Sequence, residues 1–413
     1  MSSRLIVFFC FLIAIDVYTF YGLKVLTNKF SHQKLWRYGY LLLILIAYLG
    51  IFYLINYFAN HPIHASLIRN LIVGFTFAFI VFKIIFSLFL LIDDATRIFG
   101  YVFGYASKIG ISSNSVPYPQ RRKFIGQIGL GLAALPFLSM LYGITKGKYN
   151  FKVKHVKLKF KNLPKAFDGF KLVHISDIHS GSFDSVADVQ RGIDLVNDQN
   201  ADLILFTGDL VNNDSREIEP FINNFKKLKS KHGLYSSLGN HDYGDYKKWP
   251  TEQAKTDNLE LLFSHQKEMG FNLLNNTSVF IEKGKDKIAI VGVENWGKPP
   301  FPQHGDLDKA LLNVDDSVFK ILLSHDPTHW DHKVLKHTTN IDLTLSGHTH
   351  GMQFGIEIPG FKWSPIKYIY PRWAGLYQES QQYLYVNRGF GFLGFPGRVG
   401  IWPEITTIEL TSV

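Results

Sequence analysis

The sequence predicts an α/β domain that is preceded by an α-helical transmembrane region. The first 145 residues contain long apolar runs rich in Phe, Leu, Ile and Tyr, whereas the later residues alternate short β-rich segments with helical spacing. A chain of 413 residues has room for both parts. We therefore expect a transmembrane region at 1–145, a basic linker with a first strand at 146–167, and the α/β domain at 168–413.

About four membrane helices are expected in the first part. Three apolar runs are long enough to cross a hydrocarbon core of ~30 Å, namely Leu5–Leu23, Tyr38–Phe58 and Leu71–Ile92. A fourth segment, Phe124–Ile144, is less apolar and rich in Gly and Ala. Asp16 and Lys83 interrupt two of the runs, and we expect them to face each other or a neighbouring helix. The single cysteine, Cys10, excludes an intrachain disulfide.

Basic residues predict how the helices are oriented. The fourth run follows Gln120-Arg121-Arg122-Lys123, which resembles a twin-arginine export signal but also fits positive-inside topology. No A-x-A-like cleavage site follows Tyr142, so we expect a retained anchor. The first and third loops carry nine basic residues: Lys24, Lys29, Lys34, Arg37, Arg97, Lys108, Arg121, Arg122 and Lys123. The second loop has only Arg69, which predicts a multi-pass protein of the bacterial inner membrane with an extracytoplasmic α/β domain.

The linker after the fourth run is strongly basic. Its seven lysines are Lys146, Lys148, Lys152, Lys154, Lys157, Lys159 and Lys161. Apolar residues alternate with them from Val153 to Phe160, which predicts a strand with a solvated lysine face, with lipid contact as an additional possibility. The net charge of +10 does not require nucleic acid, because no nucleic-acid-binding signature accompanies it, and no protein partner is evident.

The second part alternates strands and helices. The β-rich segments are Lys171–Ser176, Ala201–Thr207, Leu234–Leu238, Lys287–Val293, Lys320–Ser324, Ile341–Ser346, Tyr383–Asn387 and Glu404–Leu410. Helical spacing appears at Val186–Asn200 and Ile218–Lys231, which gives βαβ units. The aromatic segments Asn295–Gln303, Phe354–Tyr377 and Asn387–Trp402 fit either the core of a second sheet or a surface that meets acyl chains or the bilayer.

Five polar motifs occur in order along this part, and most follow a strand-like segment. They are Asp177-Ile178-His179, Gly208-Asp209, Gly239-Asn240-His241-Asp242, Ser324-His325-Asp326-Pro327 and Gly347-His348-Thr349-His350. Each motif alone would be ordinary turn chemistry or a structural histidine. Together they supply two carboxylates, one amide and four imidazoles, which is the ligand set of a two-metal centre. The pattern indicates a hydrolase.

The ligands divide between two divalent metal ions. Asp209 is the candidate bridge, because it directly follows an apolar strand. The first metal would take Asp177, His179 and His350, and the second would take Asn240, His325 and His348. Within each D-x-H or H-x-H pair, both side chains point the same way if the backbone is extended. Without a thiolate, the set suits Mn, Fe, Zn or Co.

His241 is the candidate catalytic residue. It follows Asn240 and can stabilise a phosphate oxygen or protonate a leaving alkoxide, with Asp177 or Asp242 holding its tautomer. The expected nucleophile is a hydroxide that bridges the metals.

The five motifs resemble the calcineurin-like metallophosphoesterase superfamily, whose pattern is D-x-H, G-D, G-N-H-[DE], H and G-H-x-H. The resemblance covers about residues 168–413. It implies an αββα two-sheet sandwich, the metal ligands given above, and His241 as the catalytic histidine. The sequences around Ser324 and Gly347 are similar to those of the membrane-associated branch that includes YaeI- and YkuE-like phosphodiesterases. Met352 replaces a common Gly of that branch, which alters the rim of the pocket and not the chemistry.

The predicted function is a membrane-anchored, two-metal-dependent phosphoesterase. It would hydrolyse phosphodiester or pyrophosphate bonds, with a lipid-linked substrate favoured by the anchor, the basic linker and the aromatic loops. The resemblance also implies UDP-2,3-diacylglucosamine pyrophosphate hydrolysis in lipid A synthesis, although that substrate is made on the cytoplasmic face, opposite to the predicted orientation. A membrane sensor or scaffold with a metal-binding domain is the alternative of another class. It predicts a missing ligand, and none is missing.

Overall fold

The computed structural model describes residues 3–60, 63–107 and 118–413. The chain forms two compact units. The first contains Met1–Asn60 and Leu71–Tyr142, and the second contains His61–Asn70 and Gly143–Val413. Lys108, one of the basic residues of the predicted third loop, lies outside the described residues.

The first unit is built from long apolar helices. These are α1 (Ser3–Thr27), α2 (Gln33–Asn60), α3 (Leu67–Ser107) and α4 (Tyr118–Thr145). Each is long and apolar enough to cross a membrane, and at most 39% of any such window is buried, so most of its apolar side chains face outward as they do in lipid. The four predicted spans are therefore present. α3 continues well beyond Ile92, the predicted end of the third span, so that Arg97 lies on the helix and not in a loop.

Charged residues inside this unit are paired. Nζ of Lys83 lies 2.5 Å from Oδ1 of Asp16, and the Tyr48 hydroxyl donates to the other oxygen of Asp16 at 2.9 Å. The expectation that these two charges face each other is thus confirmed. The side chains of Lys83 and Asp16 are only 3% and 9% exposed, so the pair joins α1 to α3 in a buried position.

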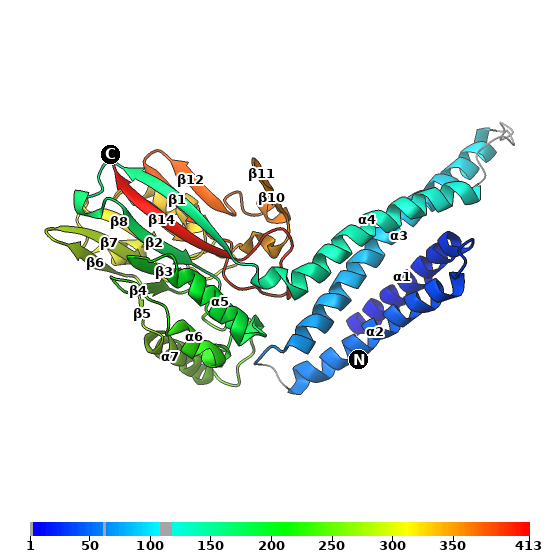
Figure 1. Ribbon diagram of the computed structural model, residues 1–413, viewed down its shortest axis with the longest axis horizontal. Coiled ribbons are helices and arrows are strands. Elements are labelled where there is room, and N and C mark those ends of the chain that lie inside the picture. The colour runs from blue at the N-terminus through cyan, green and yellow to red at the C-terminus, as the bar shows by residue number, and fades with distance from the viewer. Residues whose placement is uncertain (1–2, 61–62, 108–117) are drawn as a thin grey trace. The chain divides into compact units, whose positions relative to one another are not determined.

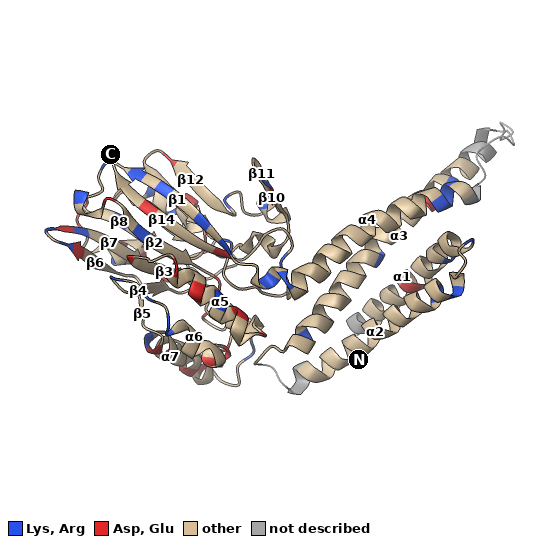
Figure 2. Cartoon of the chain, viewed as in Figure 1, with Lys and Arg blue, Asp and Glu red and all other residues tan. Residues whose placement is uncertain are grey.

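The two arginines of the export-like motif are also bound. Nε of Arg121 lies 3.1 Å from Oδ1 of Asp93, and Arg122 forms an ion pair with Asp94. Arg97, one turn after Asp93, binds the second oxygen of that carboxylate. Figure 2 shows this group of charges where α3 and α4 meet, and a second basic group where α1 turns into α2. The arginine pair therefore has a structural role within the folded helices.

The second unit contains two six-stranded sheets and a separate hairpin (Figure 1). The first sheet has the order β1 (Lys152–Phe160), β14 (Glu404–Ser412), β2 (Phe170–Ile175), β3 (Leu203–Thr207), β4 (Leu234–Ser237) and β5 (Phe271–Leu273). The second has the order β12 (Gly375–Glu379), β13 (Gln382–Val386), β9 (Leu343–Ser346), β8 (Phe319–Leu323), β7 (Asp286–Gly292) and β6 (Thr277–Lys283). The hairpin pairs β10 (Ile356–Ile358) with β11 (Phe361–Trp363).

The sheets pack face to face and carry helices on their outer faces. One buried cluster joins inner-face residues of both sheets, including Leu172, Leu205 and Ile408 of the first with Ile290, Ile321 and Leu345 of the second. A second cluster packs the first sheet against α5 (Val186–Asn197), α6 (Ile222–Phe225) and α7 (Glu252–Glu268). A third packs the second sheet against α8 (Leu307–Leu311) and α9 (Thr328–His332). The predicted αββα sandwich is therefore present.

Some elements differ from the sequence-based expectation. The segment Ile218–Lys231 is not one helix: a 3-10 turn, η4 (Ser215–Phe221), precedes the four-residue α6. Pro220 lies inside η4, and its missing N–H disfavours a continuous α-helix. The lysine-rich segment before residue 160 does form the predicted strand, because β1 pairs in parallel with β14 along its whole length.

Candidate metal centre

The polar motifs converge at one edge of the sandwich. Asp177 and His179 follow β2, Asp209 follows β3, and Asn240 and His241 follow β4 of the first sheet. His325 follows β8, and His348 and His350 follow β9 of the second sheet. β2, β3 and β4 run parallel to one another, as do β8 and β9, so the carboxyl ends of each set lie at one edge of its sheet. The structure brings all eight sequence-predicted site residues to this edge.

The backbone of the motifs turns sharply. Asp177, His179, Asp209, His348 and His350 all have positive φ, between 47° and 70°. The predicted extended geometry of the D-x-H and H-x-H pairs is therefore wrong. The strands have already ended, and the chain reverses through left-handed residues, a costly conformation that concentrates at functional sites.

Two glycines permit close approach of these turns. A Cβ at Gly347 would lie 2.2 Å from Oδ2 of Asp177, and one at Gly239 would lie 2.2 Å from Oδ1 of Asp209. A larger residue at either position would displace a candidate ligand. These two glycines are thus part of the site's geometry.

Two groups of ligand atoms lie side by side. In the first group, one ligand atom from each of Asp177, His179 and His350 lies within 4.8 Å of the others. In the second, the same holds for Asp209, His325 and His348. Oδ2 of Asp209 lies 3.5 Å from Nε2 of His179 and 3.0 Å from Nε2 of His325, so this one carboxylate oxygen stands between the groups.

Asn240 completes the second group. Its Oδ1 lies 2.9 Å from Nδ1 of His348. The asparagine also donates from Nδ2 to the hydroxyl of Tyr246 at 2.9 Å, which directs Oδ1 toward the site.

The chemistry of these groups fits bound divalent cations. Nε2 of His179 and Nε2 of His350 are buried and have no hydrogen-bond partner, which is uncommon for buried polar atoms. Burial lowers the pKa of His179 to about 3 and that of His350 well below its ordinary value, so both imidazoles are neutral and able to bind metal. Burial also raises the pKa of Asp177 to about 7. A cation would restore the charged carboxylate and occupy the unpartnered nitrogens.

The imidazoles are held from outside by other groups. Nδ1 of His325 donates to the carbonyl of Thr207 at 2.6 Å, and Nδ1 of His179 donates to Oδ1 of Asn212 at 3.1 Å. Such contacts fix the tautomer and aim the other nitrogen inward. Nη2 of the buried Arg398 lies 3.2 Å from Nδ1 of His350, and the same guanidinium donates to the carbonyl of Gly391.

Tyr370 supports the last imidazole. Its hydroxyl lies 2.8 Å from Nε2 of His348, which leaves Nδ1 to face Asn240. Oδ2 of Asp326 lies 3.5 Å from the same Nε2. Tyr370 and Asn212 were missed in the sequence, because neither belongs to one of the five motifs.

His241 lies over the cluster and has a different environment. Its backbone N–H donates to Oδ1 of Asp209 at 2.9 Å, and its ring Nδ1 lies 2.8 Å from the carbonyl of Asn212. The ring centroid of His241 is 4.9 Å from that of His179 and 4.5 Å from that of Tyr246. With Nδ1 bound to a carbonyl, Nε2 is available to a substrate.

The predicted partner of His241 was wrong. Asp242 instead accepts backbone N–H groups of Asp209, Leu210 and Gly239, and so organises the turns of the site. Asp177 accepts the Ser176 hydroxyl and the backbone N–H of His348. A backbone carbonyl, which sequence patterns do not reveal, holds the tautomer of His241.

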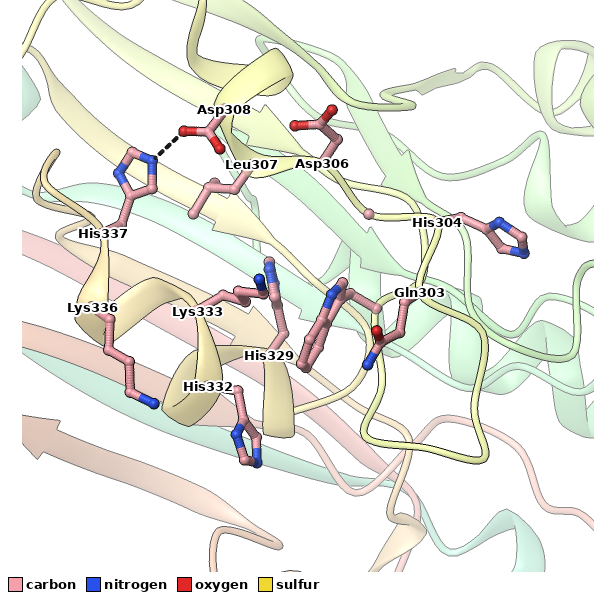
Figure 3. Close-up of a pocket in the computed structure, with 12 residues that line it drawn as sticks. Gln303, His304, Asp306, Leu307, Asp308, His329, His332, Lys333, Lys336 and His337 are labelled. Carbon is pink, nitrogen blue, oxygen red and sulfur yellow. Dashed lines mark hydrogen bonds and ion pairs between the residues drawn. The ribbon is translucent and has the colours of Figure 1, made fainter.

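The aromatic loop Asn295–Gln303 contacts the metal centre and also lines a separate cavity. The ring centroids of Phe301 and His348 are 4.8 Å apart, and the two ring planes are perpendicular. Trp296 instead lines a cavity of about 610 Å³. Figure 3 shows that cavity with His329, His332 and Lys333 along one side and the His337–Asp308 pair along another. None of the candidate metal ligands lines it.

Comparison with known proteins gives the family. Residues 170–352 match the family described as calcineurin-like phosphoesterase, and residues 3–148 match the family described as probable calcineurin-like phosphoesterase, transmembrane domain. A transmembrane protein with metallophosphoesterase domain from Danio rerio is 30% identical over 324 residues, which cover 76% of this chain and 70% of the relative. The chain belongs to the calcineurin-like metallophosphoesterases.

Two further relatives of this metallophosphoesterase come from bacteria. The metallophosphoesterase YkuE of Bacillus subtilis is 32% identical over 262 residues, which cover 62% of this chain and 84% of YkuE. The phosphodiesterase YaeI of Escherichia coli is 27% identical over 249 residues, which cover 58% of this chain and 82% of YaeI. The predicted membership in the membrane-associated branch is confirmed. This metallophosphoesterase is a metal-dependent phosphoric ester hydrolase of a membrane protein family.

Proposed function

We propose that this metallophosphoesterase uses two divalent metal ions to hydrolyse a phosphodiester or pyrophosphate bond, and that its substrate is linked to lipid. The observation that carries the proposal is the position of Oδ2 of Asp209 between two groups of ligands, 3.5 Å from His179 and 3.0 Å from His325. A carboxylate oxygen between two ligand groups suits a two-metal site, in which the ions lie ~3.5–4 Å apart.

The ligands and the residues around them have distinct roles in this proposal. Asp177, His179 and His350 would hold one ion, Asn240, His325 and His348 would hold the other, and Asp209 would contact both. Such ions supply Lewis acidity toward phosphoryl oxygens and lower the pKa of the attacking water. His241, oriented by the Asn212 carbonyl, would donate from Nε2 to a phosphoryl oxygen or pass a proton to the leaving oxygen.

Membrane attachment supports a lipid-linked substrate. The described residues contain four candidate spans, which tether the metal centre to a membrane. Basic residues gather where α1 turns into α2 and where α3 and α4 meet (Figure 2), which favours a cytoplasmic position for that end of the helices. We propose on this basis an extracytoplasmic metal centre in a bacterial inner membrane.

The experiment is hydrolysis of bis-(p-nitrophenyl) phosphate and p-nitrophenyl phosphate by the full chain with added Mn²⁺. We expect diester turnover by the wild type and its loss in Asp209→Asn, with the fold intact. Asp245→Asn is the matched control, because Asp245 is an exposed carboxylate of the same region that pairs with Lys255. Near-normal turnover in Asp209→Asn would contradict the shared-carboxylate assignment.

A further inference from the structure

The surface between Met352 and Ile369 is unusually apolar. Twelve large apolar side chains are exposed between Gly143 and Val413, and six of them lie in this short stretch. They are Met352, Ile356, Ile358, Phe361, Tyr368 and Ile369, with exposures of 51–74%, and we call them the apolar surface. Apolar side chains gathered in this way mark a site of contact with another phase or molecule.

The hairpin in this surface exposes its apolar face. Ile358 pairs with Phe361 across β10 and β11, and Glu357 pairs with Lys362, so these two pairs occupy opposite faces. Glu357 of the polar face is turned to the body of the domain, because its Oε1 lies 3.0 Å from Nζ of Lys154. The apolar face is left exposed, whereas an ordinary surface hairpin buries that face and exposes its polar one.

The polar face is firmly fixed. Oε2 of Glu357 lies 3.0 Å from Nε of Arg388, a side chain that is only 5% exposed. Lys362 donates to the carbonyl of Ala374. The hairpin therefore cannot turn its apolar face inward without breaking a partly buried ion pair, and Figure 1 shows it standing apart from the two large sheets.

The base of the hairpin is linked by hydrogen bonds to Gly143, where the second unit resumes after the first. The N–H of Gly355 donates to the carbonyl of Val399 at 2.9 Å, and the N–H of Arg398 donates to the carbonyl of Gly143 at 3.3 Å. Gly143 belongs to the span Gln120–Thr145. A few residues of chain therefore connect the apolar surface to the point where the polypeptide leaves α4, which keeps lipid within its reach.

The charges and the aromatic residue around this surface also suit lipid. Lys154, which binds Glu357, belongs to β1, and that strand exposes Lys152, Lys157 and Lys159. Nζ of Lys367 lies 5.1 Å from the centroid of the exposed Tyr368 ring. Aromatic and aliphatic side chains beside lysines are the composition of surfaces that rest in the membrane interface.

We propose that the apolar surface inserts into the interface of the bilayer that holds the chain's own helices, and so keeps the mouth of the metal centre at headgroup level. Ile369 directly precedes Tyr370, whose hydroxyl contacts His348, and Met352 lies two residues after His350. The inference goes beyond the proposed function, because this surface would bind lipid whatever bond the enzyme cleaves.

The test places a fluorescent label on the hairpin of the full chain. In a Cys10→Ser background, Ile358→Cys is labelled with NBD and the protein is reconstituted in nanodiscs of phosphatidylcholine and phosphatidylglycerol. Leu312→Cys is the matched control, because Leu312 is an apolar side chain of the same domain that is 77% exposed, outside the apolar surface. A label held ~5–10 Å into the headgroup and acyl boundary is quenched by lipids with a shallow doxyl group.

We expect quenching several-fold stronger at position 358 than at position 312, and its reduction when Phe361→Ser and Ile369→Ser are added. Equal quenching at the two positions would overturn the proposal. A blue-shifted label at 358 without doxyl quenching would also overturn it, because that result means a protein occupant. Strong quenching in a chain that fails to cleave either nitrophenyl ester would refute the proposed function and leave the docking surface standing.

Discussion

Removing the hydroxyl of Tyr370 should lower the affinity of one metal site and leave the affinity of the other unchanged. In Tyr370→Phe the ring remains beside the buried Trp373 and Ile401, so the local packing is kept. The change removes the 2.8 Å contact with Nε2 of His348. His348 then loses the group that orients its Nδ1 toward Asn240.

The size of the effect follows from the contacts of His348. Mutating the outer partner of a metal-binding histidine typically costs ~10–100-fold in metal affinity. Asp326 remains 3.5 Å from the same Nε2 and preserves part of the support, so we expect the lower end of the range. We therefore expect about a tenfold loss of metal affinity in the second site, which corresponds to ~1.4 kcal/mol of binding free energy. His179 and His350 keep their own partners, Asn212 and Arg398, so the first site should retain its affinity.

The assay is a Mn²⁺ titration of the full chain in competition with a chromophoric chelator, which resolves two binding steps. Tyr377→Phe is the matched control, because the Tyr377 hydroxyl accepts the backbone N–H of Trp373 at 3.0 Å in the same segment and stands away from the ligands. Wild-type affinity in both steps for Tyr370→Phe would refute the reasoning. An equal loss in both steps, or the same loss in Tyr377→Phe, would mean that the segment as a whole had been disturbed.

Further outcomes are expected elsewhere in the chain. His241→Ala should lower diester turnover by ~10²–10⁴-fold with metal content unchanged, and loss of metal would make His241 a ligand. Lys83→Met should destabilise the detergent-solubilised chain by ~3–5 kcal/mol in thermal unfolding, with Asp16→Asn restoring part of the loss; additive losses would contradict a coupled pair. Burial lowers the pKa of His329 to about 3, below its ordinary value of ~6.5, so protonation of the unfolded chain should remove ~2 kcal/mol of stability on going from pH 7 to pH 5. In His329→Gln, unfolding monitored by fluorescence should no longer show this loss of stability between pH 7 and pH 5. An unchanged dependence of the free energy of unfolding on pH would exclude His329 as its source. A periplasmic reporter fused after Val413 should be active, and an inactive one would reverse the proposed orientation.

The sequence was most informative where one physical pattern decides the structure. Long apolar runs predicted the candidate spans, because length and hydropathy alone set what crosses a bilayer. Apolar strands followed by polar residues placed Asp177, Asp209 and His325 at strand ends, because parallel strands bring their carboxyl ends to one edge. The two-sheet sandwich itself came from the family resemblance and not from periodicity.

Other features left no such pattern. α7 was missed because three of its four buried residues, Asn258, His265 and Gln266, are polar, so the helix lacks an apolar stripe. The third span was predicted to end at Ile92, although α3 continues through Asp93 because Arg97 and Arg121 neutralise that carboxylate. Asn212 and Tyr370 lie in loops, and their importance depends on contacts with distant residues that only the folded chain creates.

The position of β14 between β1 and β2 affects how the protein is made. β14 joins β1 across 252 positions of the chain, as Lys157 and Glu409 illustrate. Synthesis is sequential, so the membrane helices and nearly all of the α/β domain leave the ribosome while β1 still has an unpaired edge. Non-local pairing of this kind is slow and exposes strands to aggregation. Chains whose synthesis stops before β14 would remain in the membrane with β1 unpaired. Quality-control proteases would be expected to degrade such chains.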